Sequence, residues 1–425
     1  DEATSDLEPW ADQTIQLTLQ ASVRDNPTRA YAAFASPAIL GSPSDSGPRR
    51  VVVVGLDTLR PDHLQTHGYT QPNSPGMQRI AQQSVVFRQN RAPAPRTRPS
   101  FRTATTGRWP LPAIEAPTLG DILQAQGFTT AGFVANVQLS PRLGFADGYG
   151  LWSYDNMSDA DVQVDRVLKW MQTHQTEDSA VFLHLMDPHI FYLAPEPFRD
   201  RFTADHDQGK LPDKFNRWNV TRWFNKGELS DSQINFIKAR YDGEIAFMDR
   251  EILRLVHAMD QMPGQTLFVF HSDHGEEFFE HGAFEHNHSL YDELVRTVLW
   301  IRPPGGWSGG PHMVDVPTSL VDLVPTVLDL LDIPTDARPP TDGTSLAPFV
   351  SANKRAKTEE LSQQLKERPL HLGYLMLDKE RWAVVTHQNK YILHTITGQE
   401  ERYDLATDPG EHSDLAAEQP EKLGV

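Results

Sequence analysis

The chain of 425 residues contains no cysteine, so disulfide bonds and thiolate metal ligands are excluded. It also lacks any run of about 18 uncharged apolar residues, the length that a membrane-spanning helix requires. Positive charge is scarce too: 39 Lys and Arg stand against 57 Asp and Glu, a formal net charge of −18. A field of this sign repels polyanions, so we expect no nucleic-acid partner. An anionic substrate would therefore need a local metal ion or a cluster of arginines.

Residues 1–48 form a polar lead and linker, rich in Ala, Ser, Pro and acidic residues, in which a helix is expected over 12–35. The chain begins at Asp1 without an initiator Met, and it carries no hydrophobic core of a signal peptide. Such a start suits a processed, exported protein and also suits a trimmed chain. Of the two we favour export, to the periplasm or the extracellular space.

Short apolar runs rich in β-branched residues alternate with helical patterns along the middle of the chain. Five runs are typical of buried strands, namely 51–57, 129–137, 180–186, 266–271 and 297–301. The clearest helical pattern spaces apolar residues three or four apart between Ile234 and Leu255. Strands that alternate with helices predict an α/β fold with a mostly parallel sheet covered on both faces.

The composition divides the rest of the chain into two expected parts. Residues 49–350 form the expected catalytic domain. Residues 351–425 form the expected charged connector, 351–368, and a small C-terminal antiparallel subdomain. Within that subdomain, 382–386 and 390–395 are typical of short strands.

Histidines and carboxylates cluster directly after one apolar run. Five of the 17 histidines fall within residues 271–288, and imidazole with carboxylate is a ligand set that suits Mn, Fe or Zn. Asp57, Asp187 and Asp273 each follow the end of a separate run. Because parallel strands share one carboxyl-end edge, these three side chains are expected to converge there. The pattern predicts a metal site at this edge of the sheet.

A second informative segment runs from Arg96 to Arg108. Pro99, followed by helix-compatible residues, is typical of the first turn of a helix, which places the hydroxyl of Thr97 at the helix N-terminus. Free N–H groups and the helix dipole favour an anion or a developing oxyanion there. The plainer alternative is that Thr97 is only an N-cap.

Eight sequence blocks occur in one order along the chain. They are Leu56-Asp-Thr-Leu-Arg-Pro-Asp-His-Leu64, Thr97-x-Pro-Ser with Thr106-Gly-Arg-Trp-Pro110, Asp187-Pro-His189, Tyr241-Asp-Gly-Glu-Ile245, Ser272-Asp-His-Gly-Glu276, Val321-Asp-Leu-Val-Pro-Thr326, Asp342-Gly-Thr-Ser-Leu346 and Tyr403-Asp-Leu-x-x-Asp-Pro409. Together they resemble the sulfatase family of the alkaline phosphatase superfamily over roughly residues 50–415. The resemblance implies an alkaline-phosphatase-like α/β/α sandwich with a smaller C-terminal sheet. It also implies a metal-assisted attack on a phosphorus or sulfur centre.

The departures from the family pattern bear on the chemistry. Sulfatases carry Cys or Ser at the position of Thr97, oxidised to formylglycine, with an Arg at the position of Phe101. Thr97 cannot give that aldehyde, so no formylglycine is expected. Thr58 replaces the second Asp of the usual pair. What remains resembles the Thr-nucleophile branch, akin to nucleotide pyrophosphatases, lipoteichoic acid synthases and phosphoethanolamine transferases, which act through a covalent phosphothreonine.

The resemblance implies a set of ligands for one divalent cation, which would be Mn, Zn, Ca or Mg. These ligands are Asp57, Thr97, Asp273 and His274. A second set either binds a second metal or supplies acid and oxyanion contacts. It comprises Asp187, His189, and His286 or His288. Phe191 occupies a position where two-metal relatives carry His, so we favour one metal, with His189 and His286 as catalytic groups that face the substrate.

The favoured function is a metal-dependent hydrolase of small anionic esters, which cleaves phosphodiesters or phosphonate esters through phosphothreonine at Thr97. The alternatives are a sulfuric ester hydrolase, a phosphotransferase that passes a phosphoryl-linked group to an alcohol and, least favoured, an inactive binding homologue. Arg60 and Arg98 are candidate contacts of the substrate oxygens, or simply solvated cations. The aromatic-dotted segment 195–229 is either a substrate-facing lid or a decorated surface loop.

Overall fold

A computed structural model describes residues 47–110, 116–307, 312–374 and 380–417 of the chain. The N-terminal lead, with the helix expected over 12–35, lies outside the described residues except for residues 47 and 48.

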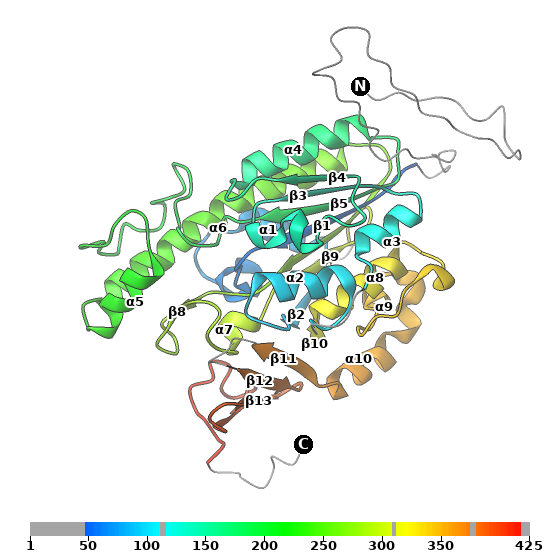
Figure 1. The fold of residues 1–425 in the computed structure, drawn as a ribbon. Helices are drawn as coiled ribbons and strands as arrows, with labels where there is room; N and C mark the ends of the chain where they lie inside the picture. The colour runs from blue at the N-terminus through cyan, green and yellow to red at the C-terminus, as the bar shows by residue number, and fades with distance from the viewer. Residues whose placement is uncertain (1–46, 111–115, 308–311, 375–379, 418–425) are drawn as a thin grey trace, which may run out of the picture. The chain divides into compact units, whose positions relative to one another are not determined.

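An eight-stranded sheet is the centre of the fold (Figure 1). Its strands are β1 (Arg49–Leu56), β2 (Val85–Arg91), β3 (Thr129–Val134), β4 (Leu151–Tyr154), β5 (Ser179–Leu185), β6 (Gln265–Ser272), β9 (Leu299–Arg302) and β10 (His312–Ser319). They lie side by side in the order β10-β2-β9-β6-β1-β5-β3-β4. Only β9 runs antiparallel to its neighbours, so the prediction of a mostly parallel sheet is confirmed. All five expected strands are present, as β1, β3, β5, β6 and β9.

Helices cover both faces of this sheet, as Figure 1 shows. They are α1 (Pro75–Ala81), α2 (Thr97–Thr106), α3 (Leu119–Ala125), α4 (Ala160–Thr173), α5 (Arg217–Asn225), α6 (Asp231–Asp260), α7 (Asp292–Val295), α8 (Leu323–Leu330), α9 (Ala347–Val350) and α10 (Thr358–Glu367). The alternation of β1 decides which core each side chain joins. Val52 and Val54 pack with α4 and α6, whereas Val51 and Val53 pack with α2, α3 and α8. The expected α/β/α sandwich is therefore confirmed.

The longest helix, α6, carries the pattern expected between Ile234 and Leu255. It begins with a capping box, in which the Ser230 hydroxyl accepts the Gln233 backbone N–H and the Gln233 side chain accepts the Ser230 N–H. In the part of the chain that the structure describes, no helix combines the length and apolarity needed to cross a membrane.

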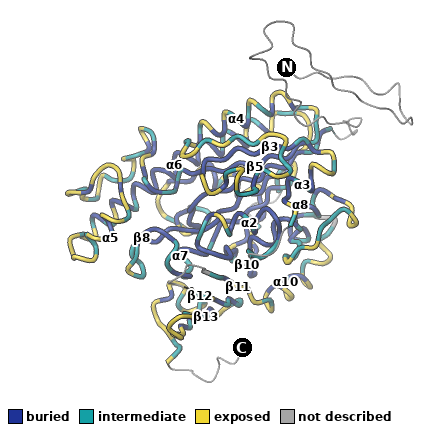
Figure 2. The backbone as a smooth tube through the Cα atoms, viewed as in Figure 1, coloured by how far each residue is buried: buried dark blue, intermediate teal, exposed yellow. Residues whose placement is uncertain are grey.

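A separate four-stranded antiparallel sheet follows the sandwich. Its strands are β11 (Leu370–Tyr374), β12 (Arg381–Val385), β13 (Asn389–His394) and β14 (Glu400–Asp404). The strands expected at 382–386 and 390–395 are β12 and β13, which confirms the small C-terminal antiparallel part. The connector is less exposed than its charge suggests, because Leu361 and Leu365 of α10 are buried in the sandwich core. Figure 2 shows the contrast between the buried central strands and the more exposed backbone of β12 and β13.

Candidate active site

Two strand ends bring two aspartates to the same edge of the sheet. β1 pairs in parallel with β6, and Leu56 lies opposite Ser272. The next residue on each strand is an aspartate, so Asp57 and Asp273 are neighbours in space although they lie 216 positions apart in the sequence. Both side chains are fully buried. The convergence predicted from the sequence is therefore present for this pair.

Each aspartate uses one oxygen for hydrogen bonds within the protein. Asp57 Oδ2 accepts the Asn136 amide at 2.7 Å and lies 3.2 Å from His184 Nε2. Asp273 Oδ1 accepts the backbone N–H of Thr58 at 3.2 Å and of His274 at 2.9 Å. The other oxygens, Asp57 Oδ1 and Asp273 Oδ2, are buried and have no hydrogen-bond partner among the described residues.

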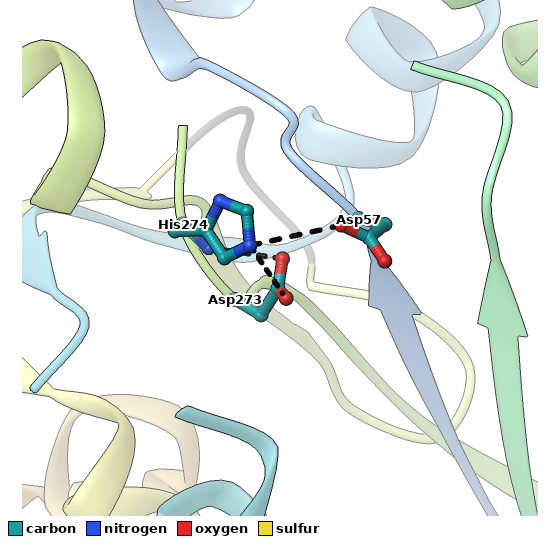
Figure 3. Close-up of side chains that lie close together, drawn as sticks. All are labelled: Asp57, Asp273 and His274. Atoms are coloured by element: carbon teal, nitrogen blue, oxygen red, sulfur yellow. Dashed lines mark hydrogen bonds and ion pairs between the residues drawn. The ribbon is translucent and has the colours of Figure 1, made fainter. Parts of the chain in front are cut away.

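His274 completes the cluster with one ring nitrogen. Its Nδ1 lies 3.0 Å from the Gly275 carbonyl, which requires a proton on Nδ1 and leaves Nε2 as the free donor atom. Nε2 lies 3.3 Å from Asp273 Oδ2 and 3.8 Å from Asp57 Oδ1 (Figure 3). Burial, together with the charge of His286, lowers the pKa of His274 to about 3, so the ring is the neutral form that can bind a metal.

These three side chains fit a divalent cation. One ligand atom from each of Asp57, Asp273 and His274 lies within 4.8 Å of the others. Burial and the charge of Asp57 raise the pKa of Asp273 well above its ordinary value. Two buried carboxylate oxygens without partners are costly unless an ion pairs with them. Carboxylate and imidazole suit Mn or Zn, and the oxygens also suit Ca or Mg.

Thr97 lies beside this cluster at the start of α2. The helix begins at Thr97 itself, and Arg96 occupies the N-cap position, so the geometry does not support the plain N-cap alternative. The Thr97 hydroxyl oxygen lies 3.3 Å from His274 Nε2. Thr97 is buried, with 7% of the residue exposed.

His189 and His286 extend the cluster on one side. The ring of His286 lies 4.4 Å from that of His274 and 5.2 Å from that of His189, measured between centroids. Glu276 Oε1 lies 2.8 Å from His286 Nδ1, and the Tyr192 hydroxyl donates to the second Glu276 oxygen at 3.0 Å. Burial alone would lower the pKa of His189, but the charges of Asp57 and Glu276 raise it. Burial and the charge of His189 lower the pKa of His286.

The residues of the possible second metal site do not converge. Asp187 Oδ1 accepts the backbone N–H of Ala160 at the start of α4, at 2.9 Å. His288 is turned away from His189, with Nε2 at 2.6 Å from Glu277 and Nδ1 at 3.1 Å from the His286 carbonyl. Within the described ranges, the one tight His and carboxylate group is the cluster of Asp57, Asp273 and His274. This arrangement favours the one-metal interpretation.

The two candidate arginines lie outside the cluster. Arg60 is buried and bonds to both oxygens of Asp62, to Glu280 and to the Glu276 carbonyl, so its donors stabilise the loop after β1. Arg98 is exposed on the first turn of α2. In the segment 195–229, α5 contacts the site indirectly: the Arg217 guanidinium donates to the His286 carbonyl at 2.5 Å and pairs with Glu285 at 2.7 Å.

Sequence reasoning missed the residues that orient the ligands. Asn136 fixes Asp57, and its position just after the strand 129–134 was the available signal, because it shares the same sheet edge. Glu276 fixes His286 and belongs to the block that begins at Ser272, but no role had been expected for it. His184 on β5 is buried as well, and its Nε2 contacts the same oxygen of Asp57.

The sheet, the two helix layers and the buried cluster define a class, the alkaline-phosphatase-like α/β fold with a candidate metal site at the strand edge. The sulfatase family model matches residues 49–333. The chain therefore belongs to the sulfatase family.

Relatives agree with this assignment. The chain is 28% identical over 193 residues to choline-sulfatase of Rhizobium meliloti (strain 1021), which covers 44% of this chain and 35% of that protein. It is 31% identical over 206 residues to arylsulfatase K of Mus musculus, which covers 46% of this chain and 35% of that protein. The chain thus spans about a third of the length of these two curated relatives.

A solved structure has the same fold. The phosphonate monoester hydrolase of Agrobacterium radiobacter superposes with a TM-score of 0.65 at 19% identity, over 87% of this chain and 91% of that one. At this identity the likeness concerns the fold alone.

Proposed function

We propose that this chain hydrolyses phosphoesters, either phosphodiesters or phosphonate esters, through a covalent phosphothreonine at Thr97. The observation that carries the proposal is the position of the Thr97 hydroxyl, 3.3 Å from His274 Nε2 and at the N-terminus of α2. Asp57, Asp273 and His274 stand beside it as a ligand set for a divalent cation. A nucleophile next to such a set is the arrangement that covalent catalysis needs.

The proposed reaction has two steps. Thr97 Oγ loses its proton and forms a bond to phosphorus, while the bond from phosphorus to the leaving alcohol breaks and that alcohol takes up a proton. Water then attacks phosphorus, breaks the bond to Thr97 Oγ and returns a proton to it. A bound divalent cation would supply the acidity that the Thr97 hydroxyl needs near neutral pH.

The two histidines have separate parts in this proposal. His189, whose pKa is raised after the charges of Asp57 and Glu276 offset burial, is the expected proton donor to the leaving alcohol. His286, whose pKa burial lowers, is the expected proton acceptor, and Glu276 orients its ring. The first turn of α2 offers N–H groups to the negative charge that develops on the phosphoryl oxygens.

Sulfate ester hydrolysis is the second candidate, because the chain belongs to the sulfatase family. Thr97 and Phe101 weigh against it. Threonine cannot become formylglycine, and Phe101 is fully buried against Phe182, His184 and His271, so no cationic side chain accompanies the nucleophile at that position. The solved relative named as a phosphonate monoester hydrolase supports the phosphorus centre within the same fold. The phosphotransferase and the inactive homologue stay less favoured alternatives.

An assay panel tests the proposal directly. We expect purified metal-loaded protein to turn over aryl phosphodiesters or phosphonate esters well above aryl sulfates. Acid quenching during turnover of a slow substrate should give one phosphoryl adduct on the peptide that contains Thr97, detected by mass spectrometry. Efficient sulfatase activity without an adduct would contradict the proposal. Export to the periplasm or beyond stays a prediction, which fractionation of the native host would check.

A further inference from the structure

A cavity of about 270 Å³ lies next to the candidate active site. The residues after β5 form one wall, the start of α4 a second and the middle of α6 a third. His189 belongs to this lining and also lies beside His286, so the cavity borders the catalytic cluster. A group bound there would therefore be part of a substrate whose phosphorus is near Thr97.

Three carboxylates from three separate elements line the cavity. They are Asp159 at the N-cap of α4, Asp187 after β5, and Glu244 on α6. Glu244 is 6% exposed and accepts the backbone N–H groups of Leu193 and Ala194, which fix its carboxylate in the wall. The described residues supply no hydrogen-bond donor to Asp187 Oδ2, which is buried. The carboxylates of Glu244 and Asp187 are thus held in place, and one oxygen of Asp187 has no hydrogen-bond partner among the described residues.

The cations of the lining do not balance these charges. Lys214 is the lysine among the lining residues, and its ammonium lies 3.9 Å above the ring of Phe191. With His189 it faces three carboxyl groups whose pKa burial raises, so a cation that stabilises their charged forms suits the cavity better than the anionic part of a phosphoester. The phosphoryl group is thereby directed toward Thr97, and the cavity is left for an ester arm.

A metal ion does not suit this cavity. Outside Asp57, Asp273 and His274, the described residues hold no group of His and carboxylate atoms that lie close enough to share one ion. Apart from Ser158, the uncharged side chains of the lining are apolar or are thioethers. They are Met157, Met186, Phe191 and Leu193. An aromatic ring, methionines and carboxylates together match an organic cation, whose charge is spread over methylene or methyl groups.

We propose that this cavity is a subsite for a positively charged alkylammonium group on an ester arm of the substrate. The inference rests on the proposed function, because it assumes that the phosphorus of the same molecule reacts at Thr97. Glu244 and Asp159 determine specificity through charge.

Two matched substrates test the charge preference. One is p-nitrophenyl 2-(trimethylammonio)ethyl phosphate, and the other is p-nitrophenyl 3,3-dimethylbutyl phosphate, which has the same shape without the positive charge. We expect wild-type kcat/KM to favour the charged ester by roughly tenfold or more, since a buried carboxylate stabilises a nearby cation. Glu244→Gln should remove most of this preference, measured as the ratio of kcat/KM for the two esters. Asp165→Asn on α4, which removes an exposed charge outside the cavity, should keep it.

Asp159→Asn is a second variant if Glu244→Gln does not fold, because Asp159 is exposed and Asn also serves as an N-cap. Its expected effect is a several-fold reduction in the same preference. Equal kcat/KM for both esters in the wild type would overturn the subsite, even if the phosphothreonine adduct forms.

A binding measurement separates the subsite from the proposed catalysis. Calorimetry on the full-length Thr97→Ala protein would compare (2-hydroxyethyl)trimethylammonium with uncharged 3,3-dimethylbutan-1-ol. We expect the cation to bind at least tenfold more tightly, and Glu244→Gln in the same background to abolish the difference. Binding of the cation without any phosphoryl adduct in the wild type would support the cavity as a cation site while the proposed function fails. Loss of a tightly bound metal equivalent on Glu244→Gln would overturn the proposal.

Discussion

Two buried charge clusters in this protein follow opposite rules. At the junction between the sandwich and the C-terminal sheet, the Arg91 guanidinium binds both oxygens of Asp292 at 3.0 and 2.7 Å, and Lys390 pairs with Asp292 and Glu411 at 2.9 Å each. Two cations there balance two carboxylates. At the strand edge, Asp57 and Asp273 each keep a buried oxygen without a partner among the described residues. The first cluster is paired within the fold, whereas the second has the open oxygens of a candidate cation site.

The pKa shifts of one aspartate from each cluster, Asp292 and Asp273, express the same difference. Burial would raise the pKa of Asp292, but Arg91 and Lys390 hold it far below its ordinary value. Burial and the charge of Asp57 instead raise the pKa of Asp273. A closed set of internal partners therefore characterises a structural cluster, and an open set characterises a site for a ligand.

The largest expected effect concerns the open cluster. Thr97→Ala should reduce kcat by roughly 10³–10⁵, because it removes the nucleophile and leaves the metal ligands in place. Steady-state kinetics and metal analysis of the same preparation would check this. Thr105→Ala, which removes a hydroxyl bonded to the Phe101 carbonyl in the same helix, should retain activity. An active Thr97→Ala enzyme would assign the nucleophile elsewhere.

The second largest expected effect concerns the closed cluster of Arg91, Asp292, Lys390 and Glu411. Arg91→Ala should lower the free energy of unfolding by about 3–5 kcal/mol, because it leaves buried Asp292 short of a cation. Chemical denaturation would measure the change. Arg88→Ala is the matched control, since Arg88 makes an exposed pair with Asp315 at 3.7 Å, and it should cost less than about 1 kcal/mol. Equal losses for the two variants would remove the proposed distinction.

A smaller effect concerns the orientation of a ligand. Asn136→Ala should weaken divalent metal affinity by roughly 10–100-fold, because Asn136 fixes Asp57 Oδ2 and so aims Oδ1 at the cluster. Metal titration of the chelator-treated protein would check it. Asn156→Ala, which removes a side chain bonded to the Val137 backbone in the same loop region, should leave the affinity unchanged.

The smallest effect is a pH dependence of opposite sign for Asp273 and Asp292, measured as melting temperature in the presence of a chelator. Because the pKa of Asp273 is raised above the ordinary value of 3.8, its contribution to stability is present below pH 3.8 and is lost as the pH rises above that value. Asp273→Asn should therefore match the wild type at low pH and become the more stable protein toward neutral pH.

The closed cluster should show the reverse trend. Because the pKa of Asp292 is lowered below the ordinary value of 3.8, its contribution to stability is present above pH 3.8 and is lost as the pH falls below that value. Asp292→Asn should thus be less stable than the wild type at neutral pH, by a margin that shrinks in acid. Parallel trends for the two variants would contradict the comparison.

The sequence alone predicted the sheet and the first contacts of the site. Buried strands are recognisable because β-branched runs on a central strand are apolar on both faces, as in 51–57 and 266–271. Parallel connections then bring their carboxyl ends together, so Asp57 and Asp273 could be paired without a structure. The strand 312–319 was not predicted, since Asp315 and Pro317 interrupt its apolar pattern at the edge of the sheet.

What only the tertiary structure decided is how the polar side chains share their hydrogen bonds. His286 and His288 are equivalent by spacing, yet Glu276 orients the former beside His274 and Glu277 binds the latter. Arg60, a candidate substrate contact, donates hydrogen bonds to Asp62 and Glu280 instead. Sequence determines which chemical groups reach the sheet edge, because strand register is a local and periodic property. Which atoms remain free depends on partners from distant segments, and those meet only after the chain has packed.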